Sequence, residues 1–259
     1  MNLTVASPVP AARDFFPRGL CQPDKGFRFS TDALLLACFA DIKRGEIVVD
    51  LGTGCGVVGL GVLLRNSDLG IRIKGIDVED EMVHAARANV RALEYDGQME
   101  IFQGDVRDLG RIIPSACADV VVCNPPYRQP GRGKSCADAL KTRARFEVRA
   151  TLPEFVAGAG FMLKNRGRIY LVYLAEQLDL LFAAMQASQM VPKRVLPVHA
   201  RPGEPARLVL VEGRKNGGQS LVMDSPLFLY QCAEHQTWLS SQALAFCPFL
   251  GCNVGNKCT

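Results

Sequence analysis

A short run that joins a predicted strand to a predicted helix constrains the fold of this chain more than any other feature. Residues 46–51 are a short β-branched run, and residues 52–56 follow as Gly-Thr-Gly-Cys-Gly before a helical pattern over 57–65. A glycine-rich turn of this kind places backbone amides and the positive end of a helix at the carboxyl edge of a sheet. The run therefore predicts an α/β fold with a ligand site at that edge.

Strand and helix patterns alternate along most of the remaining chain, which is typical of a sheet with crossover helices. Further strands are predicted at 71–78, 100–103, 119–123, 168–174, 193–198 and 206–213, and helices at 33–40, 81–94, 151–163 and 176–190. Thr151 and Glu154 form a T-x-x-E capping box for the third of these helices, and Gly167 is expected to end it. We predict a Rossmann-like, doubly wound sheet with helices on both faces.

Length and composition favour one domain. The chain has 259 residues, of which 48% are hydrophobic and 22% charged, so global disorder, collagen and coiled coil are excluded. Residues 1–20 contain several prolines and are expected to be a flexible arm, with a single domain over 21–259. No apolar run is long enough for a membrane span and the opening lacks a signal-peptide pattern, so a cytoplasmic location and no membrane partner are predicted.

The ten cysteines predict reduced thiols rather than a disulfide scaffold, because no export signal is visible and no C-x-x-C pair occurs. They are enriched near the end of the chain, which we interpret as a cysteine-rich C-terminal extension. A cluster of possible ligands comprises Cys232, His235, Cys247, Cys252 and Cys258. Its spacings match no common zinc site, so no metal is predicted.

The glycine run does not fit a dinucleotide fingerprint, because G-x-G-x-x-G would need glycine where Val57 stands. It fits D-x-G-x-G-x-G, and it resembles the first motif of class I methyltransferases that use S-adenosylmethionine. The four positions of that motif are Asp50, Gly52, Gly54 and Gly56. Asp77 lies about 20 residues beyond the glycines at the end of the next strand, where a carboxylate can accept both hydroxyls of a ribose.

The motif Asn124-Pro125-Pro126-Tyr127 follows a buried strand and carries readable chemistry. Each proline fixes φ and lacks an amide donor, so the loop is stiff and its carbonyls remain free to accept hydrogen bonds. Asn124 and the Pro125 carbonyl can both accept from one planar amino group, while Tyr127 offers a flat face for stacking. These four residues are the predicted catalytic residues.

The combination resembles the N-P-P-Y amino-methyltransferases, which methylate adenine N6, guanine N2 or glutamine N5. Residues 27–37 (Phe-Arg-Phe-Ser-Thr-Asp-Ala-Leu-Leu-Leu-Ala) and the loop and strand at 201–210 are similar to segments of bacterial tRNA1(Val) adenine-N6 methyltransferases. The resemblance implies S-adenosylmethionine as the cofactor and a sheet of about seven strands whose last strand is antiparallel. It also implies that Thr31, Asp105 and Asn124 join the cofactor site, with Asp105 bonding the adenine amino group.

The resemblance favours methylation of the exocyclic N6 amine of adenine in RNA, with tRNA as the expected substrate. Protein-glutamine N5 and rRNA guanine-N2 methylation stay open as alternatives, and a nonenzymatic nucleotide-binding module leaves the N-P-P-Y loop without a task. The net charge of +4 is concentrated after that loop. The cations expected to contact RNA are Arg128, Arg132, Lys134, Lys141, Arg143 and Arg145.

Overall fold

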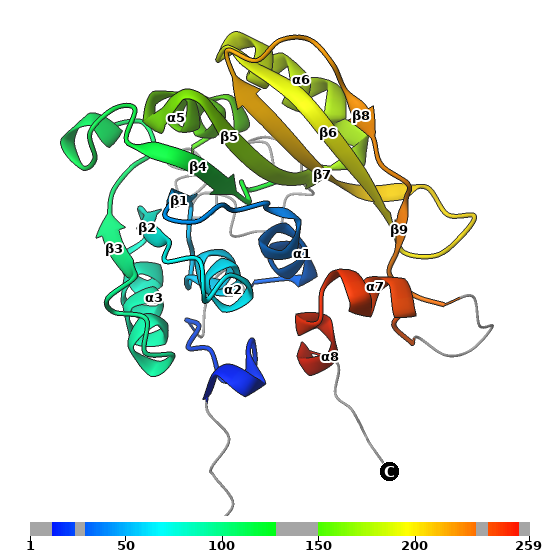
Figure 1. Cartoon of the computed structure of the whole chain (residues 1–259), viewed down its shortest axis with the longest axis horizontal. Helices are drawn as coiled ribbons and strands as arrows, with labels where there is room; N and C mark the ends of the chain where they lie inside the picture. The colour runs from blue at the N-terminus through cyan, green and yellow to red at the C-terminus, as the bar shows by residue number, and fades with distance from the viewer. Residues whose placement is uncertain (1–11, 24–28, 128–149, 232–237, 254–259) are drawn as a thin grey trace, which may run out of the picture.

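The computed structural model describes residues 12–23, 29–127, 150–231 and 238–253, and its centre is one twisted sheet (Figure 1). Within these residues the sheet has nine strands in the order β3-β2-β1-β4-β5-β7-β6-β8, with β9 paired to β6. The strands are β1 Ile47–Leu51, β2 Arg72–Asp77, β3 Met99–Gln103, β4 Ala118–Cys123, β5 Leu163–Leu174, β6 Met190–His199, β7 Ala206–Lys215, β8 Val222–Met223 and β9 Leu227–Phe228. Strands β1 to β5 are parallel, and β7 is antiparallel to both β5 and β6. The predicted doubly wound sheet with an antiparallel last long strand is confirmed.

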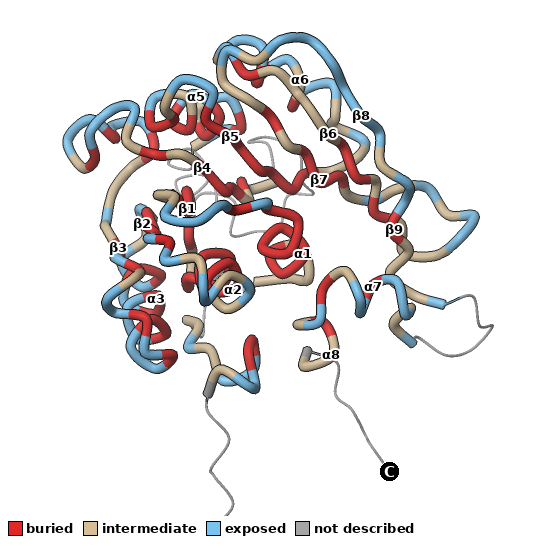
Figure 2. Tube along the Cα trace, in the orientation of Figure 1, coloured by how far each residue is buried: buried red, intermediate tan, exposed pale blue. Residues whose placement is uncertain are grey.

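Helices cover both faces of this sheet (Figure 1). One face carries α1 Thr31–Phe39, α2 Val57–Arg65, α3 Asp80–Ala92, α7 Ser241–Phe246 and α8 Phe249–Asn253, and the other carries α5 Leu152–Met162 and α6 Leu178–Ala187. Short 3-10 turns lie at Ala12–Phe15, Leu109–Arg111 and Ala175–Gln177. Alternate side chains of β4 enter opposite cores, Val120 and Val122 on the first face and Val121 and Cys123 on the second. A strand covered on both sides has to be apolar throughout, and the central strands are accordingly buried in Figure 2.

The junction between α5 and β5 differs from the sequence-based expectation. The capping box is present, with the Glu154 carboxylate accepting from the Thr151 amide at 2.6 Å. The helix ends at Met162 and β5 begins at once, so the expectation that Gly167 ends the helix is wrong. Gly167 instead follows Arg166, whose φ is +65°, at a register shift between β4 and β5. A Cβ at Gly167 would lie 2.9 Å from the Lys164 carbonyl, so this irregular part of the strand needs glycine.

Both ends of the described chain pack against the α1 and α2 face. Phe16 is 2% exposed and its ring centroid lies 4.9 Å from that of Phe249. Cys247 is fully buried, and its thiol donates to the Leu34 carbonyl of α1 at 3.5 Å. The described part of the segment expected to be a flexible arm, residues 12–20, is therefore folded onto the domain. The C-terminal segment contributes core residues rather than a separate unit.

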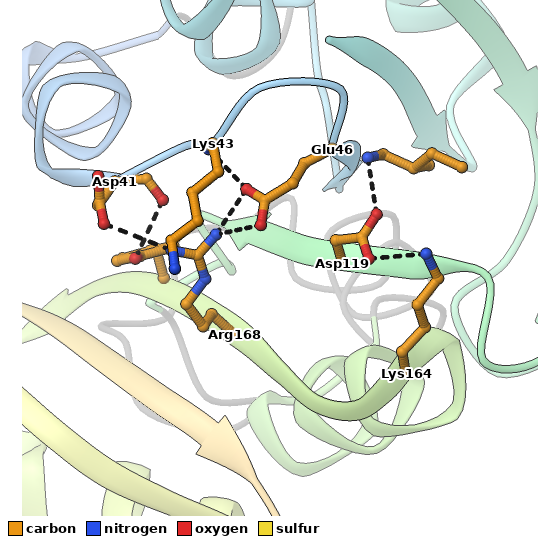
Figure 3. A network of polar contacts seen from close by, with 8 residues as sticks. Asp41, Lys43, Glu46, Asp119, Lys164 and Arg168 are labelled. Carbon is orange, nitrogen blue, oxygen red and sulfur yellow. Dashed lines mark hydrogen bonds and ion pairs between the residues drawn. The ribbon is translucent and has the colours of Figure 1, made fainter. Parts of the chain in front are cut away.

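Polar side chains form a network at the amino ends of the central strands (Figure 3). Arg168 is 5% exposed and donates to both carboxylate oxygens of Glu46, at 2.7 and 2.5 Å. Asp119 accepts from the Ile47 amide at 3.0 Å and from Lys164 at 2.6 Å. These contacts tie the starts of β1, β4 and β5 together.

Three further observations concern the described residues alone. None of their helices is long and apolar enough to cross a membrane. They contain no group of three or more histidine, cysteine, aspartate or glutamate side chains placed to hold a metal ion. Their cysteines are free thiols, at positions 21, 38, 55, 117, 123, 247 and 252.

Candidate active site

The glycine loop between β1 and α2 adopts a conformation that other residues rarely reach. Gly52, Gly54 and Gly56 have φ of +74°, +56° and +86°, all in the left-handed region. The amides of Gly52 and Thr53 both donate to the Ile76 carbonyl at 2.9 Å, which anchors the loop to the end of β2. A Cβ on Gly52 would lie 2.9 Å from the ring of Phe155. Glycine is therefore required here both by backbone conformation and by close packing.

Asp50 lies beneath this loop and braces it. The side chain is 1% exposed, and its Oδ2 accepts from the Thr53 hydroxyl at 2.6 Å and from the Gly59 amide at 2.9 Å. Burial raises the pKa of Asp50 to about 6, although both hydrogen bonds oppose that rise. Asp50 thus holds the last part of β1, the loop and the first turns of α2 in one arrangement.

Asp77 ends β2 beside the loop. Its Oδ2 accepts from the Gly54 amide at 2.8 Å and its Oδ1 from the Glu79 amide at 2.9 Å. Burial raises the pKa of Asp77 above its ordinary value, against the lowering effect of those amides. A carboxylate has about four acceptor sites, so two remain for a ligand. Within the described residues Asp77 forms no ion pair, and its free acceptor sites suit a pair of hydroxyls.

The N-P-P-Y motif lies at the same edge of the sheet, directly beside the glycine loop. Leu51 of β1 pairs with Cys123 of β4, so the residues that follow, Gly52 and Asn124, leave the sheet side by side. The hydroxyl of Tyr127 lies 3.0 Å from Asn124 Oδ1. This register places the glycine loop and the motif next to each other at one edge of the sheet.

The Tyr127 side chain is held on two further sides. Its hydroxyl donates to Asp32 Oδ2 at 2.9 Å, and its ring packs edge to face against Tyr173, with centroids 5.6 Å apart. Burial, followed by the nearby Asp32 carboxylate, raises the pKa of Tyr127 above its ordinary value. The phenol is therefore neutral across the physiological range and remains a hydrogen-bond donor.

Thr31 and Asp105 lie at the margins of this constellation. Thr31 is the first residue of α1 and precedes Asp32, which places it next to the residue that contacts Tyr127. Asp105 follows β3, and its carboxylate accepts from the Arg107 guanidinium at 2.9 and 2.5 Å. Hydrogen bonding to the Arg107 side chain lowers the pKa of Asp105, against the raising effect of burial. Asp105 is thus already engaged in a turn with Arg107.

Two residues of this site were not singled out from the sequence. Asp32 stands in the segment at 27–37 that carries the family resemblance, but its pattern predicts only a helix start. Tyr173 lies in a continuous apolar strand, where an aromatic residue predicts core packing. The segment at 27–37 was the only sequence signal that could have pointed to Asp32. Its contact with Tyr127 depends on how α1 packs, which that segment does not show. The cations expected to contact RNA, from Arg128 to Arg145, lie outside the described residues.

The fold and this site define an S-adenosylmethionine-dependent methyltransferase. The sequence matches the methyltransferase small domain family over residues 27–179, and the chain belongs to that family. The tRNA1(Val) (adenine(37)-N6)-methyltransferase of Actinobacillus succinogenes is 28% identical over 188 residues, which are 73% of this chain and 77% of the relative. The enzyme of the same name from Porphyromonas gingivalis is 28% identical over 199 residues, 74% of this chain and 76% of its own.

Solved structures show the same fold. A predicted O-methyltransferase from Agrobacterium tumefaciens superposes with a TM-score of 0.68 at 20% identity, over 84% of this chain and 96% of its own. TrmN from Thermus thermophilus superposes with a TM-score of 0.51 at 20% identity, over 71% of this chain and 48% of its own. Both likenesses concern the arrangement of the sheet and helices.

Proposed function

We propose that this protein transfers a methyl group from S-adenosylmethionine to the N6 amine of an adenine in tRNA. The observation that carries the proposal is the register of β1 and β4, which sets the N-P-P-Y motif beside the glycine loop. Two relatives that align over about three quarters of the chain bear the name tRNA1(Val) (adenine(37)-N6)-methyltransferase. Family membership supports methyl transfer, and the motif supports an amine or amide nitrogen as the acceptor.

The residues present fit the cofactor. The amide-rich loop at Gly52, Gly54 and Gly56 offers close backbone approach to a carboxylate or sugar, and no atom within 4 Å would meet a Cβ on Gly54. Asp77 would accept from the ribose hydroxyls through its two free acceptor sites. Thr31 and Asn124 would contact the amino-acid end, with Asp50 bracing the loop from below. Asp105 would bond the adenine amino group with the acceptor sites that Arg107 leaves free.

The chain's own residues supply orientation rather than a nucleophile. S-adenosylmethionine supplies an activated methyl group when bound, so no covalent enzyme intermediate is required. Asn124 Oδ1 and the Pro125 carbonyl would accept hydrogen bonds from the two N–H groups of the target amine, which directs its lone pair at the methyl carbon. That nitrogen would take the methyl group from the bound cofactor, which would leave as a neutral thioether, and the methylated amine would release one proton to water.

The target adenine has to leave any base stack to reach this site. Tyr127 and Pro126 flank the place where a base would enter, and the ring of Tyr127 is fixed edge to face on Tyr173. A fixed ring offers a stacking surface at low entropic cost. We further propose that the basic segment following Tyr127 contacts the phosphates of the RNA, since it carries seven lysines and arginines against two acidic residues.

Incubation of the full chain with methyl-labelled S-adenosylmethionine against unmodified tRNA, rRNA, release factor and DNA tests the proposal. We expect label in tRNA, recovered as N6-methyladenosine after nuclease digestion. Label in rRNA as N2-methylguanosine, or in release factor as methylglutamine, would replace this function with one of its alternatives. No label in any substrate, from a protein that binds the cofactor, would support a nonenzymatic module.

The variant Asn124→Ala tests the active-site assignment directly. Loss of one preorganised polar group at a reacting centre lowers turnover by about 100-fold or more. Affinity for S-adenosylmethionine, measured by calorimetry, should fall much less, because Asp77 and the glycine loop are intact. Normal turnover of Asn124→Ala on tRNA would contradict the assignment.

A further inference from the structure

Asp32 makes a contact that the proposed function leaves unexplained. It is the second residue of α1, and its Oδ2 lies 2.9 Å from the hydroxyl oxygen of Tyr127. The same hydroxyl lies 3.0 Å from Asn124 Oδ1. One phenol therefore connects the start of α1 to the side chain that would hold the target amine.

With Asn124 Oδ1 facing the Tyr127 hydroxyl, the contacts of that hydroxyl with Asp32 and with Asn124 cannot both be hydrogen bonds. A phenol carries one proton, while an ionised carboxylate and an amide oxygen can only accept. A carboxylate is a stronger hydrogen-bond acceptor than an amide oxygen, so the Tyr127 hydroxyl donates to Asp32 rather than to Asn124. The contact with Asn124 would then bring two oxygens together without a proton between them.

A half-turn of the Asn124 amide removes this conflict. The oxygen and nitrogen of an amide have nearly the same shape, so the turn leaves the packing unchanged. Nδ2 then donates to the Tyr127 oxygen, Tyr127 donates to Asp32, and each contact has one proton. Oδ1 consequently points away from Tyr127, where it can accept from a bound amine.

We propose that Asp32 is a positioning residue that acts through Tyr127 to orient the Asn124 amide, with Nδ2 toward the phenol and Oδ1 toward the target amine. This inference rests on the proposed function of Asn124. Without the Asp32 carboxylate, the phenol can donate to Asn124 Oδ1, which turns the Nδ2 donor toward an amine that is itself a donor. The hydroxyl of Tyr127 thus acts in addition to its ring.

The first experiment measures the link without any substrate. Urea unfolding of the wild type, Asp32→Asn, Tyr127→Phe and the double variant gives a coupling between the two positions. Groups in one hydrogen-bond network are non-additive, so we expect the double variant to differ from additivity by about threefold or more in the unfolding constant. Additive effects would overturn the proposal. Asp179→Asn is the control for a purely structural role of Asp32 at the start of its helix. It removes a carboxylate from the same position, the second residue, of α6.

The second experiment measures turnover on unmodified tRNA, the substrate of the proposed reaction. We expect Asp32→Asn and Tyr127→Phe each to lower kcat by about tenfold or more with little change in KM, because the tyrosine ring and the RNA contacts remain. The double variant should be no slower than the slower single variant. Multiplicative losses, or normal turnover of Asp32→Asn, would overturn the proposal, and Asp179→Asn should turn over normally.

An exchange of the two polar side chains tests the orientation itself. In Asn124→Asp two carboxylates compete for one phenol proton, so activity should be very low. Adding Asp32→Asn lets residue 32 donate to the phenol and lets the phenol donate to residue 124, so each contact again has one proton although the direction of donation is reversed. We expect a recovery of about tenfold, and no recovery would overturn the assigned orientation. An inactive wild type would instead contradict the proposed function, while the unfolding cycle would still decide the link between Asp32 and Tyr127.

Discussion

Carboxylates at the two ends of the parallel strands have different kinds of hydrogen-bond partner. At the carboxyl edge, Asp50 and Asp77 are held by backbone amides and a hydroxyl, and within the described residues neither forms an ion pair. At the amino edge, Glu46 and Asp119 are paired with Arg168 and Lys164 (Figure 3). Burial raises the pKa values of the first pair. For Asp119, burial alone would raise the pKa, but the hydrogen bonds from the Ile47 amide and Lys164 outweigh it, so the pKa is lowered.

This difference separates a binding edge from a structural edge. An ion pair uses the acceptor sites of a carboxylate, whereas backbone amides at the loop leave sites of Asp77 free for a ligand. A buried carboxylate without a cation costs stability, which is common at functional sites. Residues at the structural edge should therefore affect folding, and residues at the binding edge should affect the ligand.

The largest stability effect is expected at the structural edge. In Arg168→Met, Glu46 keeps its charge at 17% side-chain exposure and loses its main partner, because Arg168 donates to both of its oxygens. Breaking a buried pair by removing one partner costs about 3–5 kcal/mol. Urea unfolding should show this loss, and the double variant Arg168→Met/Glu46→Gln should recover most of it. Unchanged affinity for S-adenosylmethionine in the folded single variant would support the separation of a structural edge from a binding edge. A large loss of affinity would contradict that separation.

The next effect concerns pH and the binding edge. The pKa of Asp50 is raised from 3.8 to about 6, so its contribution to stability is fully present below its unfolded pKa and is lost as pH rises through about 6. The shift corresponds to about 3 kcal/mol between pH 4 and 7. We expect the wild type without cofactor to lose stability over this window relative to Asp50→Asn. A parallel pH dependence of the two proteins would contradict the raised pKa.

Asp119 provides the matched case with the opposite sign. Because its folded pKa is lowered, its contribution is present above its unfolded pKa and is lost as pH falls through the folded value. Asp119→Asn should therefore differ from the wild type at neutral pH and approach it in acid. If both substitutions shifted stability with the same sign, the two edges would not differ in the way described.

The sequence predicted the binding edge better than the structural edge, for a physical reason. Gly52, Gly54 and Gly56 are required by local backbone geometry, so their pattern is visible in a short window. Arg168 and Glu46 are 122 residues apart and meet only because β4 pairs with both β1 and β5 in the sheet. Charged residues in such positions carry no local signal that separates them from a solvated surface.

The same limit applies within the site. The stiffness of the loop from Asn124 to Tyr127 follows from its prolines, whereas its position beside the glycine loop depends on the pairing of β1 with β4. The contact of Tyr127 with Asp32 spans 95 residues and depends on the depth at which α1 packs against the sheet. Register and helix entry angle are set by the whole core, which residue patterns do not resolve.

A smaller effect is expected from Asp77→Ala, and it should fall on the ligand. Loss of charged hydrogen bonds to the ribose costs about 1.5–3 kcal/mol of affinity for S-adenosylmethionine. The Gly54 and Glu79 amides lose an acceptor as well, but they lie in a loop that water can reach. Calorimetric titration measures the affinity, with Asp119→Ala as a control that removes a carboxylate from the other edge. Unchanged affinity of a folded Asp77→Ala would remove Asp77 from the cofactor site.

The smallest loss of folding stability is expected from Lys164→Ala, at the same structural edge as Arg168→Met. Its ammonium lies 2.6 Å from Asp119 Oδ1, nearly as close as the 2.5 Å contact between Arg168 and Glu46, but the side chain is 44% exposed. Solvent screens the attraction and holding a long side chain costs entropy, so such pairs contribute about 0.2–1 kcal/mol. Asp119 also keeps the Ile47 amide as a donor after the substitution, which leaves no buried group unpaired. Urea unfolding at low and at 1 M salt should show a small loss that salt removes, because a Debye length of about 3 Å at 1 M is comparable to the contact itself. A loss as large as that of Arg168→Met would mean that distance rather than burial governs the ion pairs at this edge.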